Sequence, residues 1–175
     1  VTTHIVKEVL AHVRRMTYIG ARDFIEPGNL LCLKNGVLNL ETLELKPHSH
    51  EYIFFSKLQV MYDKDADCPT IKKFLSKIIH PEGIMVLQEV AGYLLESGYP
   101  IQKAFLFLGS GANGKSTFLS LLREFIGGEN CSAISLQQLS QSKFAMANLF
   151  GKRANILPDL SHSTVTDLGW FKMLV

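Results

Sequence analysis

The stretch that decides the fold is a glycine-rich loop, Gly109-Ser110-Gly111-Ala112-Asn113-Gly114-Lys115-Ser116, followed by Thr117. It fits the pattern G-x-x-x-x-G-K-[ST] at every fixed position. Its glycines let the backbone turn so that successive N–H groups, and those of the helix starting near Gly114, point at phosphate oxygens. Lys115 supplies a mobile positive charge, and Ser116 a hydroxyl for magnesium. We therefore expect the residues from Gly109 to Thr117 to bind ATP, or a related triphosphate, with Mg²⁺.

Both flanks of the loop favour this interpretation over a glycine-rich surface turn. Before it, Ala104 to Leu108 form a continuous apolar run, which predicts a parallel strand buried on both faces. After it, apolar residues recur at helical spacing as far as Gly127-Gly128, a typical helix stop. The pattern strand, loop, helix predicts an α/β fold of the P-loop NTPase class.

A P-loop enzyme also needs a carboxylate at the end of a neighbouring strand to hold magnesium. The best candidate is Asp159, after the short apolar segment 154–157 and Pro158, which must close that strand because it cannot donate to a ladder. By itself the segment fits equally well a helix cap at Asp159 or Ser161. The P-loop upstream favours the metal role, so we expect Ser116 and Asp159 to bind Mg²⁺, and Lys115 and Asp159 to be catalytic.

The region before the loop predicts a small α+β domain. Apolar residues at helical spacing predict a helix over 4–15 with a possible cap at Thr3. Asn35-Gly36 between two apolar runs predicts a hairpin, with 43–46 as a possible third strand. Helices are expected at about 69–79 and 82–96, and the pattern breaks at 97–100. We therefore divide the chain into 1–98, a domain preceding the ATPase, and 99–175, the first part of the ATPase.

Composition indicates a folded globular chain. Of its 175 residues 47% are apolar and 19% charged, which argues against disorder, and the net charge of +2 is too small to indicate nucleic acid by itself. The three cysteines are far apart in sequence, and no apolar run is long enough to span a membrane. We expect a location inside the host cell, in the cytoplasm. The start at Val1 and the apolar end suggest a fragment.

Several strings together resemble a known family. The loop with Asn113 before Gly114-Lys115 is followed by Leu136 to Leu139, Phe144-Ala145 and the run 149–156. These strings resemble the superfamily 3 helicases of phage and plasmid primase–helicase proteins, which are relatives of the poxvirus primase–helicase. Upstream, 35–40, Tyr62-Asp63, Cys68-Pro69, Leu87 to Glu89 and Gly92-Tyr93 are similar to the domain that precedes the helicase core in that family.

The resemblance implies ATP-driven unwinding of DNA during replication of a mobile element, by a homo-oligomeric ring, usually a hexamer, around one strand. It also implies that Asp159 is the Walker B acid and that Asn113 lines the loop. Pro158 departs from the paired acids that many members carry there. The family's sensor asparagine and arginine finger would follow Val175, so we expect this chain to bind nucleotide with little turnover.

Two other functions share the P-loop. A small-molecule kinase would need a lid and an acceptor pocket, and no arginine-rich lid is visible. A non-catalytic module would oligomerise on binding nucleotide without hydrolysing it. Lys143, Lys152, Arg153 and Lys172 could form a basic face toward DNA, or simply a solvated surface.

Overall fold

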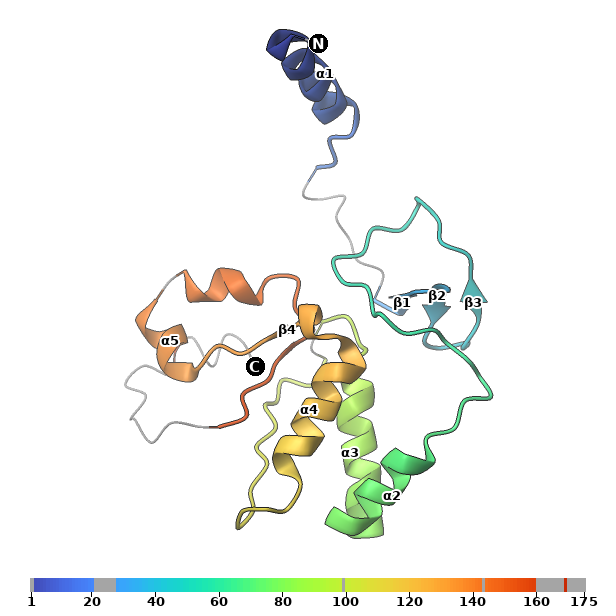
Figure 1. The fold of residues 1–175 in the computed structure, drawn as a ribbon, viewed down its shortest axis with the longest axis vertical. Coiled ribbons are helices and arrows are strands. Elements are labelled where there is room, and N and C mark those ends of the chain that lie inside the picture. The colour runs from blue at the N-terminus through green and yellow to red at the C-terminus, as the bar shows by residue number, and fades with distance from the viewer. Residues whose placement is uncertain (1, 21–27, 99, 143, 160–168, 170–175) are drawn as a thin grey trace.

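The computed structural model describes residues 2–20, 28–98, 100–142, 144–159 and 169 (Figure 1). It combines helices with two small sheets, so the expected mixture of α and β structure is confirmed at that level. The helices are α1 Thr3–Met16, α2 Pro69–Ile78, α3 Pro81–Tyr93, α4 Lys115–Ile126 and α5 Leu136–Gln141, with short 3₁₀ turns η1 Gly128–Asn130 and η2 Ala145–Leu149. The strands are β1 Leu30–Leu33, β2 Gly36–Asn39, β3 Leu45–Lys46, β4 Cys131–Ser132 and β5 Ala154–Asn155.

The predicted hairpin is confirmed as an antiparallel pair. β1 and β2 pair with Leu31 opposite Leu38 and Leu33 opposite Gly36, so the turn residues are Lys34 and Asn35, and Gly36 is the first residue of β2 rather than part of the turn. Side chains alternate across a strand, which brings leucines to one face. Leu31, Leu33 and Leu38 are buried there with Leu58, which forms the core of this sheet.

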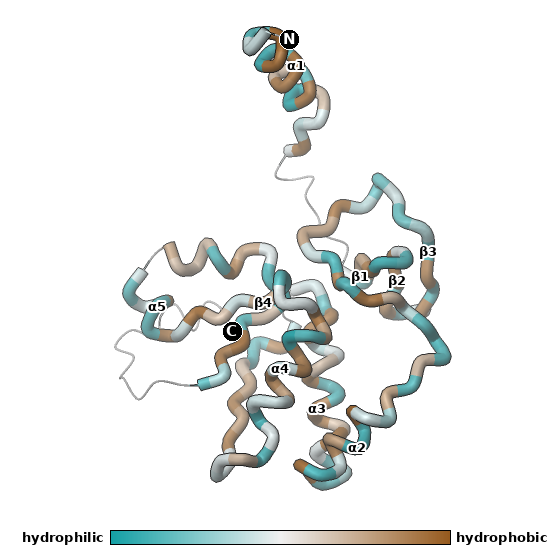
Figure 2. The backbone as a smooth tube through the Cα atoms, in the orientation of Figure 1, coloured by the Kyte–Doolittle hydropathy of each residue, from teal (hydrophilic) through white to brown (hydrophobic). Residues whose placement is uncertain are grey.

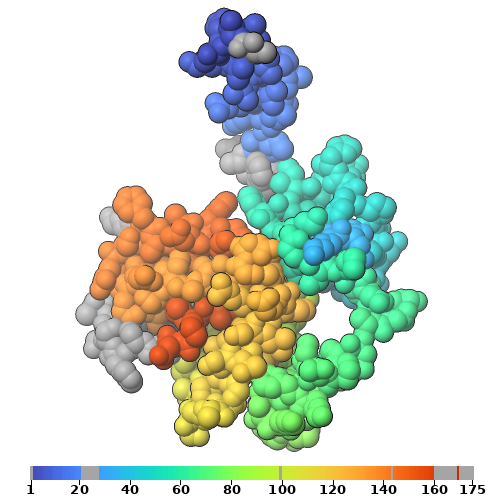
Figure 3. All heavy atoms as spheres, viewed as in Figure 1, coloured from blue at the N-terminus to red at the C-terminus, as the bar shows by residue number. Residues whose placement is uncertain are grey.

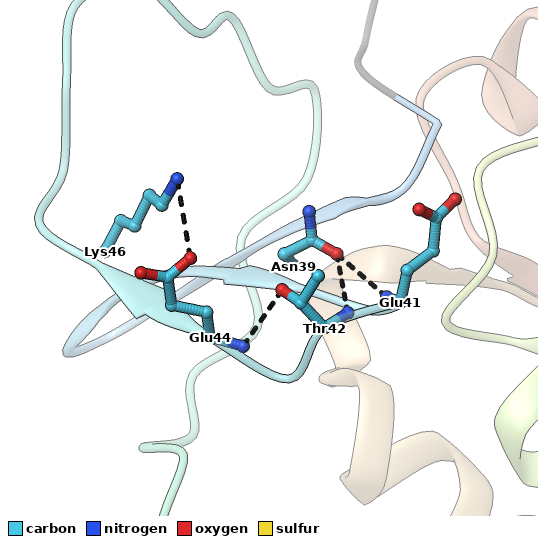
Figure 4. A network of polar contacts seen from close by, with 5 residues as sticks. All are labelled: Asn39, Glu41, Thr42, Glu44 and Lys46. Carbon is cyan, nitrogen blue, oxygen red and sulfur yellow. Dashed lines mark hydrogen bonds and ion pairs between the residues drawn. The ribbon is translucent and has the colours of Figure 1, made fainter.

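The third strand is shorter than the sequence predicts. β3 contains only Leu45–Lys46, because Leu43 adopts a left-handed conformation with φ 56° and so ends the extended backbone. The turn before it is held by the Asn39 side chain, whose Oδ1 accepts hydrogen bonds from the N–H groups of Glu41 and Thr42 (Figure 4). An asparagine that satisfies the backbone in this way favours a turn over a strand.

Three helices share the second core. α2 and α3 confirm the two predicted helices, although α3 ends at Tyr93 rather than near 96, and a proline occupies the first turn of each. They pack against α4 through a common set of buried side chains (Figure 1). That set is Leu75, Leu87, Val90, Phe118 and Leu122. The helix after the loop is thereby supported by the two helices before it.

The prediction of a buried strand at 104–108 is wrong for the described structure. The segment is not a strand, and Phe105, Leu106 and Leu108 are 45%, 63% and 81% exposed. Alternate side chains do reach the helices, since the Phe107 ring meets that of Phe118 edge-on at 5.6 Å. A strand also needs a hydrogen-bonded neighbour, and among the described residues β4 and β5 pair only with each other. Figure 2 shows this hydrophobic segment beside α4.

The first helix confirms the prediction for residues 4–15, with a different cap. Thr2, not Thr3, is the N-cap of α1, and no side-chain cap hydrogen bond forms. None of its residues is buried, and apolar side chains such as Val9 and Leu10 are about half exposed. In the described part of the chain, no helix has the length and hydrophobicity to cross a membrane.

Candidate phosphate-binding site

The glycine-rich loop leads directly into α4. Gly114 is the N-cap of this helix with φ 82°, and Gly111 and Ala112 also have positive φ, at 99° and 47°. Repeated left-handed residues fold the loop tightly, and two of the three are glycines, which tolerate this conformation. The first turn of α4 has no side-chain cap and no acidic residue. Its N–H groups and positive dipole end are therefore open to an anion.

The loop encloses a small hollow. Residues 111–117 line a space of about 370 Å³ at the start of α4. Within it Lys115 is half-buried, while Ser116 and Thr117 are exposed on the first helical turn. The predicted loop residues from Gly111 to Thr117 are thus gathered around one concavity.

The Lys115 ammonium is held by the loop itself. Its Nζ donates to the Asn113 Oδ1 at 2.8 Å and to the Gly109 carbonyl at 3.1 Å. A Cβ at Gly109 would lie 1.9 Å from the Asn113 Nδ2, so a side chain there would displace the Asn113 amide. Gly109 therefore leaves room for the close approach of Asn113, a role that its place in the motif does not reveal.

Helix α2 supports the loop from behind. A Cβ on Gly114 would lie 2.8 Å from the Ile78 Cγ2 at the end of α2, closer than carbon atoms approach without a shift. Gly114 thus meets two demands, a positive φ and a tight contact with Ile78. The sequence signals the first demand, but nothing in the sequence signals Ile78.

Asp159 lies at the end of the segment that follows β5, and it is exposed. It and Lys115 both line a larger groove of about 940 Å³, which runs between the segments 101–108 and 151–159 and is mostly apolar. The structure thus brings these two predicted catalytic residues to one groove. The alternative helix cap at Ser161 lies outside the described residues, as do Lys143 and Lys172 of the predicted basic face.

Arg153 is not a solvated basic residue. Its Nε donates to the Ser56 Oγ at 2.8 Å and its Nη1 to the Leu95 carbonyl at 2.9 Å. The buried Asn130 acts in a similar way, because its Nδ2 donates to the carbonyls of Ile126 and Lys57. Neither role has a sequence signature, since each depends on partners far along the chain. Figure 3 shows the segments near 130 and 150 in contact with those near 55.

Among the described residues, no three His, Cys, Asp or Glu side chains come together as a metal site.

Comparison with known proteins gives two partial matches. Residues 2–80 match the family described as D5 N terminal like, and residues 107–175 match a family of unknown function, DUF5906. The first match supports, at a coarse level, a relationship to D5-like primase–helicases of phages and plasmids. The second includes the glycine-rich loop and carries no function of its own. No curated protein matches the chain.

Proposed function

We propose that this chain is the ATP-binding part of a superfamily 3 primase–helicase, with a partial P-loop NTPase core after a D5-like N-terminal domain. The observation that carries the proposal is the loop at the start of α4. A lysine ammonium, an uncapped helix N-terminus and left-handed residues at Gly111 and Gly114 surround one hollow. These groups complement a polyphosphate in charge and in hydrogen-bond donors.

Each residue has a role that follows from its chemistry. The N–H groups of the loop and of the first turn of α4 hold the β- and γ-phosphates, and Lys115 neutralises their charge. Ser116 and Asp159 bind the magnesium ion, which when present draws charge away from the phosphate oxygens. The assignment of Asp159 is supported by the groove whose lining includes both Asp159 and Lys115.

The match of residues 2–80 favours the helicase over the other P-loop functions. A small-molecule kinase has no use for a D5-like domain, whereas a primase–helicase has one before its ATPase. On this proposal the partner is single-stranded DNA in the channel of a homo-oligomeric ring, a hexamer by family resemblance. The chain itself turns nucleotide over slowly, because stabilising the transferring phosphoryl group needs an arginine from a neighbouring subunit.

The proposal is tested by separating binding from turnover. The chain is titrated with ATP with and without Mg²⁺ by calorimetry, and phosphate release is measured with and without single-stranded DNA. We expect saturable binding that is tighter with Mg²⁺ and a slow release of phosphate. The Asp159→Asn variant should lose most of the magnesium dependence and keep the metal-free affinity, while Asp65→Asn, an exposed control, should change neither. Equal affinity with and without Mg²⁺ in the wild type would contradict the assigned metal role.

A further inference from the structure

Asn113 connects the two ends of the phosphate loop. Its Oδ1 accepts a hydrogen bond from the Lys115 Nζ at 2.8 Å, and its Nδ2 lies so close to Gly109 that a Cβ there would displace it. The Lys115 Nζ also donates to the Gly109 carbonyl at 3.1 Å. Three residues from the start, middle and end of the loop thus form one closed set of contacts.

We propose that Asn113 is a positioning residue that sets the Lys115 ammonium in place for the triphosphate before the nucleotide arrives. The proposal rests on the nucleotide-binding function proposed above, and it attributes part of the nucleotide affinity to the Asn113 side chain. Asn113 acts through Lys115, which remains the group that meets the phosphates.

The donor count of the ammonium supports this role. A lysine ammonium has three N–H donors and no acceptor. Asn113 and Gly109 take two of them, which leaves one for a ligand. These two hydrogen bonds also restrict a long side chain that would otherwise lose rotamer entropy on binding a ligand. A ligand that meets an ordered lysine pays less of this cost, so its affinity is higher.

The amide is also the right chemical group for this position. It is a neutral acceptor, so it holds the ammonium without cancelling the charge that attracts phosphate. An aspartate of the same shape would pair with Lys115 and add a negative charge next to the incoming triphosphate. An alanine would leave the ammonium mobile. Asparagine therefore holds the Lys115 ammonium in place without reducing its positive charge.

The test is a double-mutant cycle on nucleotide affinity. Wild type, Asn113→Ala, Lys115→Ala and the double variant are titrated with a fluorescent ATP analogue and Mg²⁺. Asn148→Ala, an exposed asparagine on η2, is the matched control. Thermal unfolding of each variant checks that it is folded. We expect Asn113→Ala to weaken binding about fivefold in the wild-type background, which is in the range of one ordinary net hydrogen bond, and less than about twofold in the Lys115→Ala background.

The Asn113→Asp variant supplies a second readout. It should bind the ATP analogue more weakly than Asn113→Ala does. Added salt should reduce the difference in affinity between the two variants, because salt screens the repulsion between the aspartate and the triphosphate. An Asn113→Ala variant that binds as tightly as wild type, or the same fivefold loss in both backgrounds, would overturn the role assigned to Asn113 and leave nucleotide binding intact. Failure of the wild type to bind at all would instead overturn the proposed function, and the inference with it.

Discussion

The Arg153 Nε donates to the Ser56 Oγ at 2.8 Å and so joins two residues that lie 97 positions apart. The same guanidinium reaches the Leu95 carbonyl, and the Phe55 and Phe150 rings next to the two residues meet edge-on at 5.3 Å. The segment after β3 is therefore attached to the segment that leads into β5. Through β5 this attachment extends to the groove that holds Asp159.

The attachment through Arg153 predicts a loss of stability when its donors are removed. Arg153→Met keeps an unbranched stem of similar size to the arginine methylenes but leaves the buried Ser56 hydroxyl and the Leu95 carbonyl without this donor. We expect the free energy of unfolding to fall by about 1–3 kcal/mol, measured by urea denaturation. Lys73→Ala, at an exposed position on α2, is the control and should change stability by less than about 0.5 kcal/mol. An Arg153→Met variant as stable as that control would show that the contact contributes nothing.

Gly114 should not tolerate a side chain, for two separable reasons. Gly114→Ala imposes a left-handed conformation that costs about 1–2 kcal/mol, and its Cβ also meets the Ile78 Cγ2 at 2.8 Å. Gly98 has φ 88° and open space around it, so Gly98→Ala should show the conformational cost alone. We expect Gly114→Ala to be the more destabilising of the two by urea denaturation.

Shortening Ile78 separates the clash from the backbone strain at Gly114. In an Ile78→Ala background, Gly114→Ala should cost less than it does in the wild type, because the blocking methyl group is gone. Equal costs in the two backgrounds would mean that α2 does not support the loop in the way described.

The cysteines should differ in reactivity with pH. Burial raises the pKa of the Cys131 thiol, an effect that the nearby positive charges of Arg123 and Lys152 partly oppose. A raised pKa means less thiolate at a given pH, so alkylation of Cys131 by iodoacetamide should set in at higher pH than for a cysteine in a short peptide. Mass spectrometry at several pH values measures it, with the exposed Cys68 as internal comparison. Lys152→Ala should delay the reaction of Cys131 further, and an earlier onset would contradict the assigned cause.

Local features of the fold were predictable from the sequence because local interactions determine them. The hairpin of β1 and β2, the proline-initiated helices α2 and α3, and the start of α4 after Gly114 depend on residues within a few positions of one another. The conformation of the segment 104–108 was not predictable in this way, and the strand predicted there is absent from the described structure. Its apolar run resembles a buried strand, but a strand forms only where a second backbone supplies hydrogen bonds, and the run itself contains no information about that neighbour.

In the candidate site, too, local features were predictable and long-range contacts were not. The motif predicted a site at the residues from Gly109 to Thr117, and those from Gly111 to Thr117 line one hollow at the start of α4. The motif did not identify Ile78, which packs behind Gly114. The sequence also did not reveal that Arg153 donates a hydrogen bond to Ser56 instead of forming part of a basic surface. These roles arise from contacts between distant segments, and side-chain type alone does not specify them.

Binding of nucleotide at Lys115 is the central claim, and one titration tests it most directly. The chain and its Lys115→Ala variant, shown to be folded by thermal unfolding, are titrated with a fluorescent ATP analogue in the presence of Mg²⁺. We predict saturable binding by the wild type and at least about tenfold weaker binding by the variant, which corresponds to about 1.4 kcal/mol. A folded wild type that does not bind, or a variant that binds equally well, would contradict the claim.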